Sequence, residues 1–240
     1  MFKHQGKKRT AKHNLKIATL LSFVAGIVNV TGFLSIHKLT TNVTGHFAFF
    51  IDGIFRWELW QGSIYLFYIL SFLLGSFLSS ALIELTNLRE RANIFVLPTL
   101  LEVAVLILIP ILVHLHAIPP PNLIACLLLF AMGVQNSFVT KISDAVVRTT
   151  HLTGLFTDLG IELSYFLFRK KPIDRKKLKA TIKLRIFIIC FFFLGGIVGG
   201  ILYNQIKFNT LLVAAALLIF GLMYNQIKLR VLLAKREYFR

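Results

Sequence analysis

The sequence is poor in cysteine, proline and acidic residues, and these shortages exclude several classes of protein. The two cysteines, Cys126 and Cys190, lie inside apolar stretches and indicate neither a disulfide framework nor a CxxC metal or redox motif. Only 10 Asp and Glu residues stand against 27 Lys and Arg residues. No HExxH motif, phosphate-binding glycine loop or nucleophile motif occurs. We therefore predict no catalytic residue, no metal site and no cofactor.

Hydrophobic residues, in contrast, make up 56% of the chain, and Phe alone occurs 23 times. The charged residues are grouped between long apolar runs, which predicts an all-α polytopic membrane protein. A net charge of +17 is also typical of nucleic-acid-binding proteins. Here the basic residues flank apolar segments and no soluble domain presents them, so we interpret the charge as positive-inside charge and expect no nucleic-acid partner.

Six apolar runs approach the roughly 20 residues that a membrane span needs. They cover 17–36, 61–85, 94–113, 122–140, 185–204 and 208–227. Two further apolar pieces, 44–56 and 153–168, are shorter. At ~1.5 Å per residue they reach only about 20 to 24 Å across a core of about 30 Å, so we interpret them as half-helices.

The distribution of positive charge discriminates between two arrangements of these segments. If all eight cross the membrane and the N-terminus is cytoplasmic, all but six of the 27 Lys and Arg residues lie inside. If the two short pieces are re-entrant, all but three lie inside. The second arrangement fits the positive-inside rule better, by a modest margin, and places both termini in the cytoplasm.

A pattern that occurs twice suggests an internal repeat. In each copy an apolar run with a Gly-x-x-Asn step is followed by a polar segment that ends in Thr-Gly and then by a short apolar piece. The residues are Gly26, Asn29, Thr44 and Gly45 in the first copy and Gly133, Asn136, Thr153 and Gly154 in the second. With three spans and one half-helix per copy, the two repeats run in opposite directions across the membrane.

The repeat also predicts how the chain is divided. The parts are a basic cytoplasmic tail (1–16), a first repeat (17–113), an external Pro-rich loop (114–121), a second repeat (122–227) with a basic cytoplasmic loop (169–185), and a basic cytoplasmic tail (228–240). Small residues follow Leu74 in the first repeat and Leu194 in the second, where Gly75 corresponds to Gly195. We interpret this ladder as a helix-packing seam in preference to a pore lining.

Two half-helices that start at the midplane bring free backbone N–H groups and positive dipole ends together. Such a place suits an anion, a carboxylate or a polar solute. We expect the hydroxyls of Thr44 and Thr153 to act as N-caps there, and capping alone is the alternative reason for Thr-Gly. The predicted substrate-binding residues are Thr44, Gly45, Thr153, Gly154, Asn29, Gln135, Asn136, His46 and His151.

Ionisable residues inside apolar segments are costly and suggest proton or ion coupling. The candidates are Asp158, Glu162, Glu102 and Asp52. Asp158 and Glu162 share a helix face, so we expect at least one of them to be protonated or paired with Arg148 or Lys141. The alternative for each acid is a buried pair that holds helices together, and Asp52 is also placed to approach the outer interface.

The chain resembles the YoaK-like family of bacterial membrane proteins, a domain of unknown function, over nearly its whole length. The resemblance is most specific at 131–136 (AMGVQN) and 149–154 (TTHLTG), and looser at 25–29 (AGIVN) and 43–46 (VTGH). Members often have Asp at the position of Asn29 and Asn at that of His46. If that Asp carries protons in relatives, Asn29 does not do so here. The resemblance implies an integral protein of the bacterial inner membrane, with no established substrate.

Three functions remain open at this point. The leading hypothesis is a carrier or channel for a small polar or anionic solute, with its site where the half-helix N-termini meet. The second is a membrane-embedded enzyme or lipid-handling protein that uses the acids and histidines. The third is a non-catalytic scaffold. In each case the expected partner is the bilayer, with anionic headgroups at the basic segments.

Overall fold

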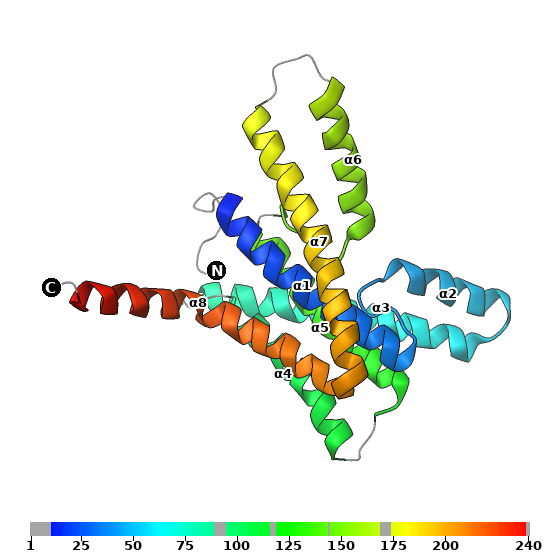
Figure 1. Ribbon diagram of the computed structural model, residues 1–240. Coiled ribbons are helices and arrows are strands. Elements are labelled where there is room, and N and C mark those ends of the chain that lie inside the picture. Colours follow the sequence, from blue (N-terminus) through cyan, green and yellow to red (C-terminus); the bar gives the residue numbers. More distant parts are fainter. Residues whose placement is uncertain (1–10, 89–94, 116–118, 144, 169–173, 239–240) are drawn as a thin grey trace.

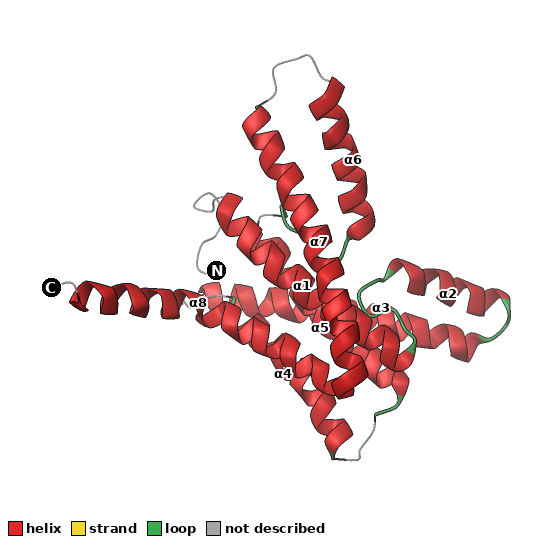
Figure 2. Ribbon diagram, viewed as in Figure 1, coloured by secondary structure: helices red, strands yellow, loops and turns green. Residues whose placement is uncertain are grey.

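The computed structural model describes residues 11–88, 95–115, 119–143, 145–168 and 174–238. All regular structure within these ranges is helical (Figure 2). The helices are α1 (Ala11–Ile36), α2 (Thr44–Phe55), α3 (Leu59–Leu88), α4 (Val96–His114), α5 (Pro121–Ser143), α6 (Leu152–Phe168), α7 (Arg175–Ile206) and α8 (Thr210–Tyr238). A short 3₁₀ helix, η2 (Lys207–Asn209), joins α7 to α8.

Five stretches of the described residues are long and apolar enough to cross a membrane, and the last of them, Arg175–Tyr224, contains both α7 and α8. The six apolar runs predicted from the sequence therefore fall in six separate helices, although the start of the run 94–113 lies outside the described residues. Neither α2 nor α6 is among the five stretches. With 12 and 17 residues, these helices are about 18 and 26 Å long.

Two helices extend beyond the apolar runs that identified them. Helix α7 begins at Arg175, within the segment expected to be a basic loop, because Asp174 caps it. The Asp174 carboxylate accepts hydrogen bonds from the backbone N–H groups of Lys176 and Lys177 at 3.0 and 3.1 Å. Helix α8 continues to Tyr238, through most of the expected C-terminal tail. Lys and Arg are good helix formers, so charge alone does not end a helix.

Helices α1 and α5 both end where a residue other than glycine adopts a left-handed conformation. His37 has a φ of 52° and Ala145 a φ of 59°. The backbone N–H of His37 donates to the carbonyl of Phe33 at 2.9 Å, and that of Ala145 donates to the carbonyl of Thr140 at 2.8 Å. These bonds use carbonyls that the helix end leaves without a partner. The chain thus leaves both helices just before the polar segments.

The most extensive helix packing joins α1 to α7 and α3 to α5. Along the first pair, Gly195 lies against Phe23, Gly199 against Ile27 and Gly200 against Val30, so the two helices run parallel. Along the second pair, Gly75 lies against Phe130 and the Ser76 hydroxyl donates to the Gly133 carbonyl at 3.1 Å. Each half of the chain therefore contributes its first long helix to a parallel pair with the second long helix of the other half.

Glycine is required at the crossing of each pair. A Cβ added to Gly26 would lie 2.1 Å from the carbonyl oxygen of Phe192, and one on Gly195 would lie 2.1 Å from that of Phe23. The α3/α5 crossing has the same reciprocal form, in which Gly133 meets Phe72 and Gly75 meets Phe130, again at 2.1 Å. The small-residue ladder is thus a packing seam, as predicted, because only glycine permits so close a backbone approach.

The two short helices, α2 and α6, each form the outer helix of a helical hairpin. Helix α2 folds back on α3 through a turn at Trp57 (φ 61°), and Gly53 packs against Gly62. Helix α6 packs along α7. Figure 1 shows both hairpins projecting from the centre of the molecule, with the N-terminal ends of α2 and α6 directed inwards and their C-terminal ends at the tips. The buried core lies mainly on α1, α4, α5 and α8.

Candidate functional site

The polar segment that follows α1 is hydrogen-bonded back to α1. The Thr41 hydroxyl donates to Oδ1 of Asn29 at 2.9 Å. Beside it, the Thr40 hydroxyl donates to the carbonyl of Val28 at 3.4 Å. Thr40 is fully buried, and a Cβ on Gly32 would lie only 2.5 Å from its Cγ2. The segment therefore packs tightly on α1.

The second half of the chain repeats this arrangement. The Thr150 hydroxyl donates to Oδ1 of Asn136 at 2.9 Å, the same bond at the same length. The buried amide of Gln135 donates through Nε2 to the Thr149 hydroxyl and to the carbonyl of Leu21, both at 3.1 Å. We call the Thr41–Asn29 and Thr150–Asn136 hydrogen bonds the two latches. The paired threonines were not among the predicted site residues, although the Thr-Thr dipeptides 40–41 and 149–150 were visible in the sequence.

The two Thr-Gly threonines do not act as predicted, because neither is an N-cap. The N-cap of α2 is Val43, which makes no side-chain cap. Instead, Oδ1 of Asn42 accepts the N–H of Gly45 at 3.1 Å, in keeping with the strong capping preference of Asn. Helix α6 begins at Leu152, so Thr153 lies within its first turn. Both threonine side chains are exposed, and within the described residues neither hydroxyl has a hydrogen-bond partner.

His46 is buried at the start of α2, with 1% of its surface exposed. Its ring lies 5.0 Å from that of Tyr68 and 5.9 Å from that of Tyr65, measured between centroids. Nε2 is 2.8 Å from the carbonyl of Leu39, so Nε2 carries the hydrogen of the neutral ring. The lone pair on Nδ1 is buried and has no partner among the described residues.

The two acids of α6 share one partner, which is not the one predicted. The guanidinium of Arg185 on α7 binds Asp158 at 3.1 Å and also binds Glu162. The expected pairing with Arg148 or Lys141 is therefore wrong. Lys141 instead binds Glu84 on α3. The common face of Asp158 and Glu162 was correctly predicted, but it turns towards α7 because α6 packs on that helix.

The remaining two acids lie in very different surroundings. Asp52 is half exposed and pairs with Arg56 one turn later, at 3.0 Å. Glu102 is completely buried within α4, and neither of its carboxyl oxygens has a hydrogen-bond partner among the described residues. Glu102 therefore differs from the other three acids, each of which has a positively charged partner.

The candidate residues form one group in each half of the chain. Asn29 and the segment before α2 form the first group, and Asn136, Gln135 and the segment before α6 form the second. His151 is exposed at the end of the second segment. Across the described residues, no hydrogen bond, ion pair or ring contact joins a candidate on α2 to one on α6, and no group of three or more His, Cys, Asp or Glu residues has metal-binding proximity.

Several long apolar helices, with polar segments fastened inside their packing, define the chain as a multi-pass α-helical membrane protein. Residues 17–224 match the family described as "Protein of unknown function (DUF1275)", and the chain belongs to that family. It is similar to the UPF0700 transmembrane protein YoaK of Bacillus subtilis (strain 168), with 26% identity over 191 residues that cover 78% of this chain and 83% of that protein. No solved structure matches significantly.

Proposed function

We propose that the protein is a carrier or channel for a small polar or anionic solute. It is built from two inverted repeats, and the solute binds where α2 and α6 begin. The matched latches carry this proposal. Two segments of non-helical backbone, one in each half, are fastened to long apolar helices by the same hydrogen bond. Non-helical backbone at membrane depth is tolerated where protein or a water-filled cavity satisfies it, and in transporters it marks the binding site.

The position of α2 along α3 supports a re-entrant half-helix. His46 contacts Tyr65 and Tyr68, which lie six and nine residues after the start of α3 at Leu59. At 1.5 Å per residue, α2 begins about 9 to 14 Å along α3. If Trp60 marks the interface, as tryptophan commonly does, α2 begins about 8 to 12 Å below it, well inside a ~30 Å hydrocarbon core and short of its midplane.

A contact between the first helices of the two halves supports the inverted orientation. Leu21 lies in the N-terminal half of α1, whereas Gln135 lies in the C-terminal half of α5. The Gln135 amide nevertheless donates to the Leu21 carbonyl. Antiparallel first helices would make a contact of this kind, and such an orientation is expected for repeats related by an axis in the membrane plane.

The chemistry of the proposed site suits a polar solute. The first turn of α6 offers backbone N–H donors, whereas in α2 the N–H groups of Gly45 and His46 already bond Asn42 and Val43. Both helices present a positive dipole end there, and the exposed Thr44 and Thr153 hydroxyls lie beside it. Nδ1 of His46 and Oε1 of Gln135 add buried acceptors that have no partner in the part of the chain that the structure describes. Donors of this kind bind anions, and the combination with acceptors also suits a neutral polar molecule.

Among the four acids, Glu102 is the best candidate for a residue that couples solute transport to proton movement. Asp158 and Glu162 share Arg185 as their cationic partner, and Asp52 pairs with Arg56 at an exposed position. An unpaired buried charge is very costly, so Glu102 requires a proton or a bound cation when it is enclosed as it is here. Release of that proton when α4 moves would couple transport to the proton gradient.

The test of function is uptake by proteoliposomes that contain the full-length protein, compared with protein-free liposomes. The panel covers inorganic anions, carboxylates and small neutral solutes, each with and without an imposed pH gradient. We expect saturable uptake of one solute class, and dependence on the pH gradient that is lost in Glu102→Gln. Absence of uptake across the whole panel, with protein shown to be folded and inserted, would contradict the proposal.

A further inference from the structure

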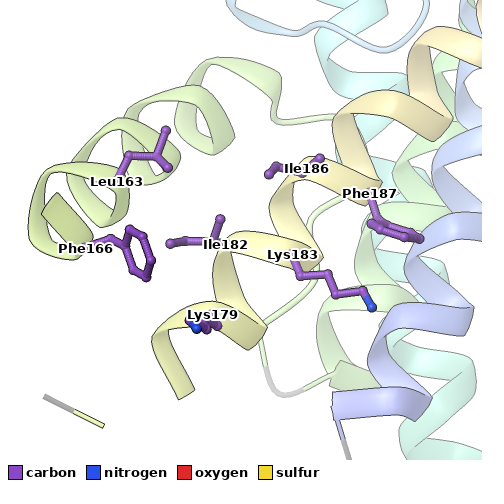
Figure 3. Close-up of a pocket in the computed structure, with 7 residues that line it drawn as sticks. All are labelled: Leu163, Phe166, Lys179, Ile182, Lys183, Ile186 and Phe187. Atoms are coloured by element: carbon purple, nitrogen blue, oxygen red, sulfur yellow. The ribbon is translucent and has the colours of Figure 1, made fainter. Parts of the chain in front are cut away.

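A groove between α6 and α7 has a chemistry that differs from that of the proposed solute site. The groove is open at the protein surface and has a volume of about 270 Å³. It is lined by Leu163, Phe166, Lys179, Ile182, Lys183, Ile186 and Phe187. Figure 3 shows Leu163 and Phe166 of α6 on the side of α7 that carries Ile182 and Ile186, whereas the Lys183 and Phe187 side chains extend to the other side of α7 in this view. Its walls are thus apolar, and the charge along it is positive.

The two lysines of the groove have no carboxylate partner within the described residues. The acids on α6, Asp158 and Glu162, are bound by Arg185. The Lys179 and Lys183 ammonium groups lie instead over the rings of Phe166 and Phe187, at 5.8 and 5.5 Å from the centroids. They are one helical turn apart on α7, so both can bind the same anionic group.

We infer that this groove binds an anionic phospholipid, with part of one acyl chain between α6 and α7 and the phosphate held by Lys179 and Lys183. The lining residues on α7 extend from Lys179 to Phe187, about 12 Å along the helix, which suits a lipid that lies along the protein. Basic pockets between membrane helices are typical sites for anionic headgroups. The inference is independent of the identity of the transported solute.

The test is a lipid titration of the full-length protein followed by native mass spectrometry. The lipids are phosphatidylglycerol and phosphatidylcholine with identical acyl chains. We expect the parent to bind phosphatidylglycerol at least tenfold more tightly, and the double variant Lys179→Gln/Lys183→Gln to lose about tenfold of that affinity or more, since each lysine near a headgroup contributes substantially. The matched control is Lys176→Gln/Lys177→Gln, which removes the same charge from the same helix outside the groove and is expected to change affinity less than about twofold.

Four results would overturn the inference. Equal losses in the two double variants would indicate diffuse electrostatic attraction, and equal binding of both lipids by the parent would exclude headgroup recognition. Displacement of the lipid by glycerol phosphate at comparable concentration would indicate a site for a free anion. Efficient disulfide cross-linking of two chains through Leu163→Cys, unchanged by phosphatidylglycerol, would show that a second copy covers the groove. Unfolding midpoints in lipid-free detergent check that the variants remain folded.

Discussion

The hydroxyl of Thr41 donates a hydrogen bond of 2.9 Å to the amide oxygen of Asn29, and the pair Thr150 and Asn136 repeats it at the same length. Side chains of four different residues thus fix two irregular segments in equivalent positions, 12 and 14 residues downstream of their acceptors. This correspondence connects the sequence repeat to the proposed binding site, because the latched segments lead directly into α2 and α6.

The latches predict a specific pattern of stability losses. Thr41→Val and Thr150→Val keep the side-chain shape but remove the donor, so each is expected to lower the free energy of unfolding by about 1 kcal/mol. The double variant is expected to lose about 2 kcal/mol, since distant sites are additive. The measurement is SDS-induced unfolding in mixed micelles. Thr157→Val is the control, because the Thr157 hydroxyl bonds only within its own exposed helix face. A loss as large in Thr157→Val would argue against the latches.

Replacement of glycine by alanine is expected to have opposite effects at the helix crossings and at an open position on α6. Gly26→Ala and Gly133→Ala place a Cβ 2.1 Å from a carbonyl oxygen of the neighbouring helix. The helices are then forced apart, at a cost of about 1–3 kcal/mol or more. Gly160→Ala, on α6, meets nothing within 4 Å and is expected to stabilise the helix by about 0.5–1 kcal/mol. Thermal unfolding in detergent distinguishes the variants, and a stable Gly133→Ala protein would contradict the close α3/α5 packing.

The ion pairs of Arg185 with Asp158 and Glu162 are expected to contribute to the free energy of unfolding by holding α6 on α7. Arg185→Gln leaves Asp158 and Glu162 as two neighbouring carboxylates without a cation. We expect a loss of about 2 kcal/mol, because the Glu162 and Arg185 side chains are largely buried, at 14% and 22% exposure. Arg56→Gln, which breaks the exposed pair with Asp52, is expected to cost less than about 0.5 kcal/mol. Similar losses in both variants, measured by SDS unfolding, would show that the α6 pair is no more than a surface contact.

The features of the fold and of the candidate site that could be predicted from the sequence are those that depend on residues close together in the chain. Helix positions, the repeat and the packing seam follow from the length of apolar runs and the spacing of small residues, which are local signals. The partner of Asp158 and Glu162 lies 27 and 23 residues away and depends on how α6 packs on α7, so the prediction of Arg148 or Lys141 was wrong. The prediction that Thr44 caps α2 was also wrong, because the neighbouring Asn42 side chain accepts the hydrogen bond that was expected to go to Thr44.

The ends of α1 and α5 show a different limit. His37 and Ala145 adopt left-handed conformations that glycine would normally mark, so the sequence carries no direct signal for these breaks. The polar residues that follow indicated a break only in general terms. The candidate site was therefore predicted as two regions of the chain, whereas the threonines that fasten those regions required the structure.

Re-entrant and crossing arrangements of α2 predict different labelling patterns. In a background with Cys126→Ser and Cys190→Ser, single cysteines replace Lys38 and Glu58, which flank α2 on its two sides. A re-entrant α2 exposes both cysteines to a membrane-impermeant maleimide on the outer face. Labelling of the two positions from opposite faces would mean that α2 crosses the membrane and that the half-helix interpretation fails.

The central claim is that a solute is bound where α2 and α6 begin, and it is tested most directly by uptake in proteoliposomes once a transported solute is found. Initial rates are compared for the parent, Thr153→Val and Thr157→Val, at equal amounts of inserted protein. The two variants remove one hydroxyl each from exposed positions one turn apart on α6. We predict that Thr153→Val lowers uptake about tenfold or more, as expected for loss of a solute hydrogen bond and a polar lining, while Thr157→Val retains the parental rate. An unchanged rate in Thr153→Val would contradict the proposed site.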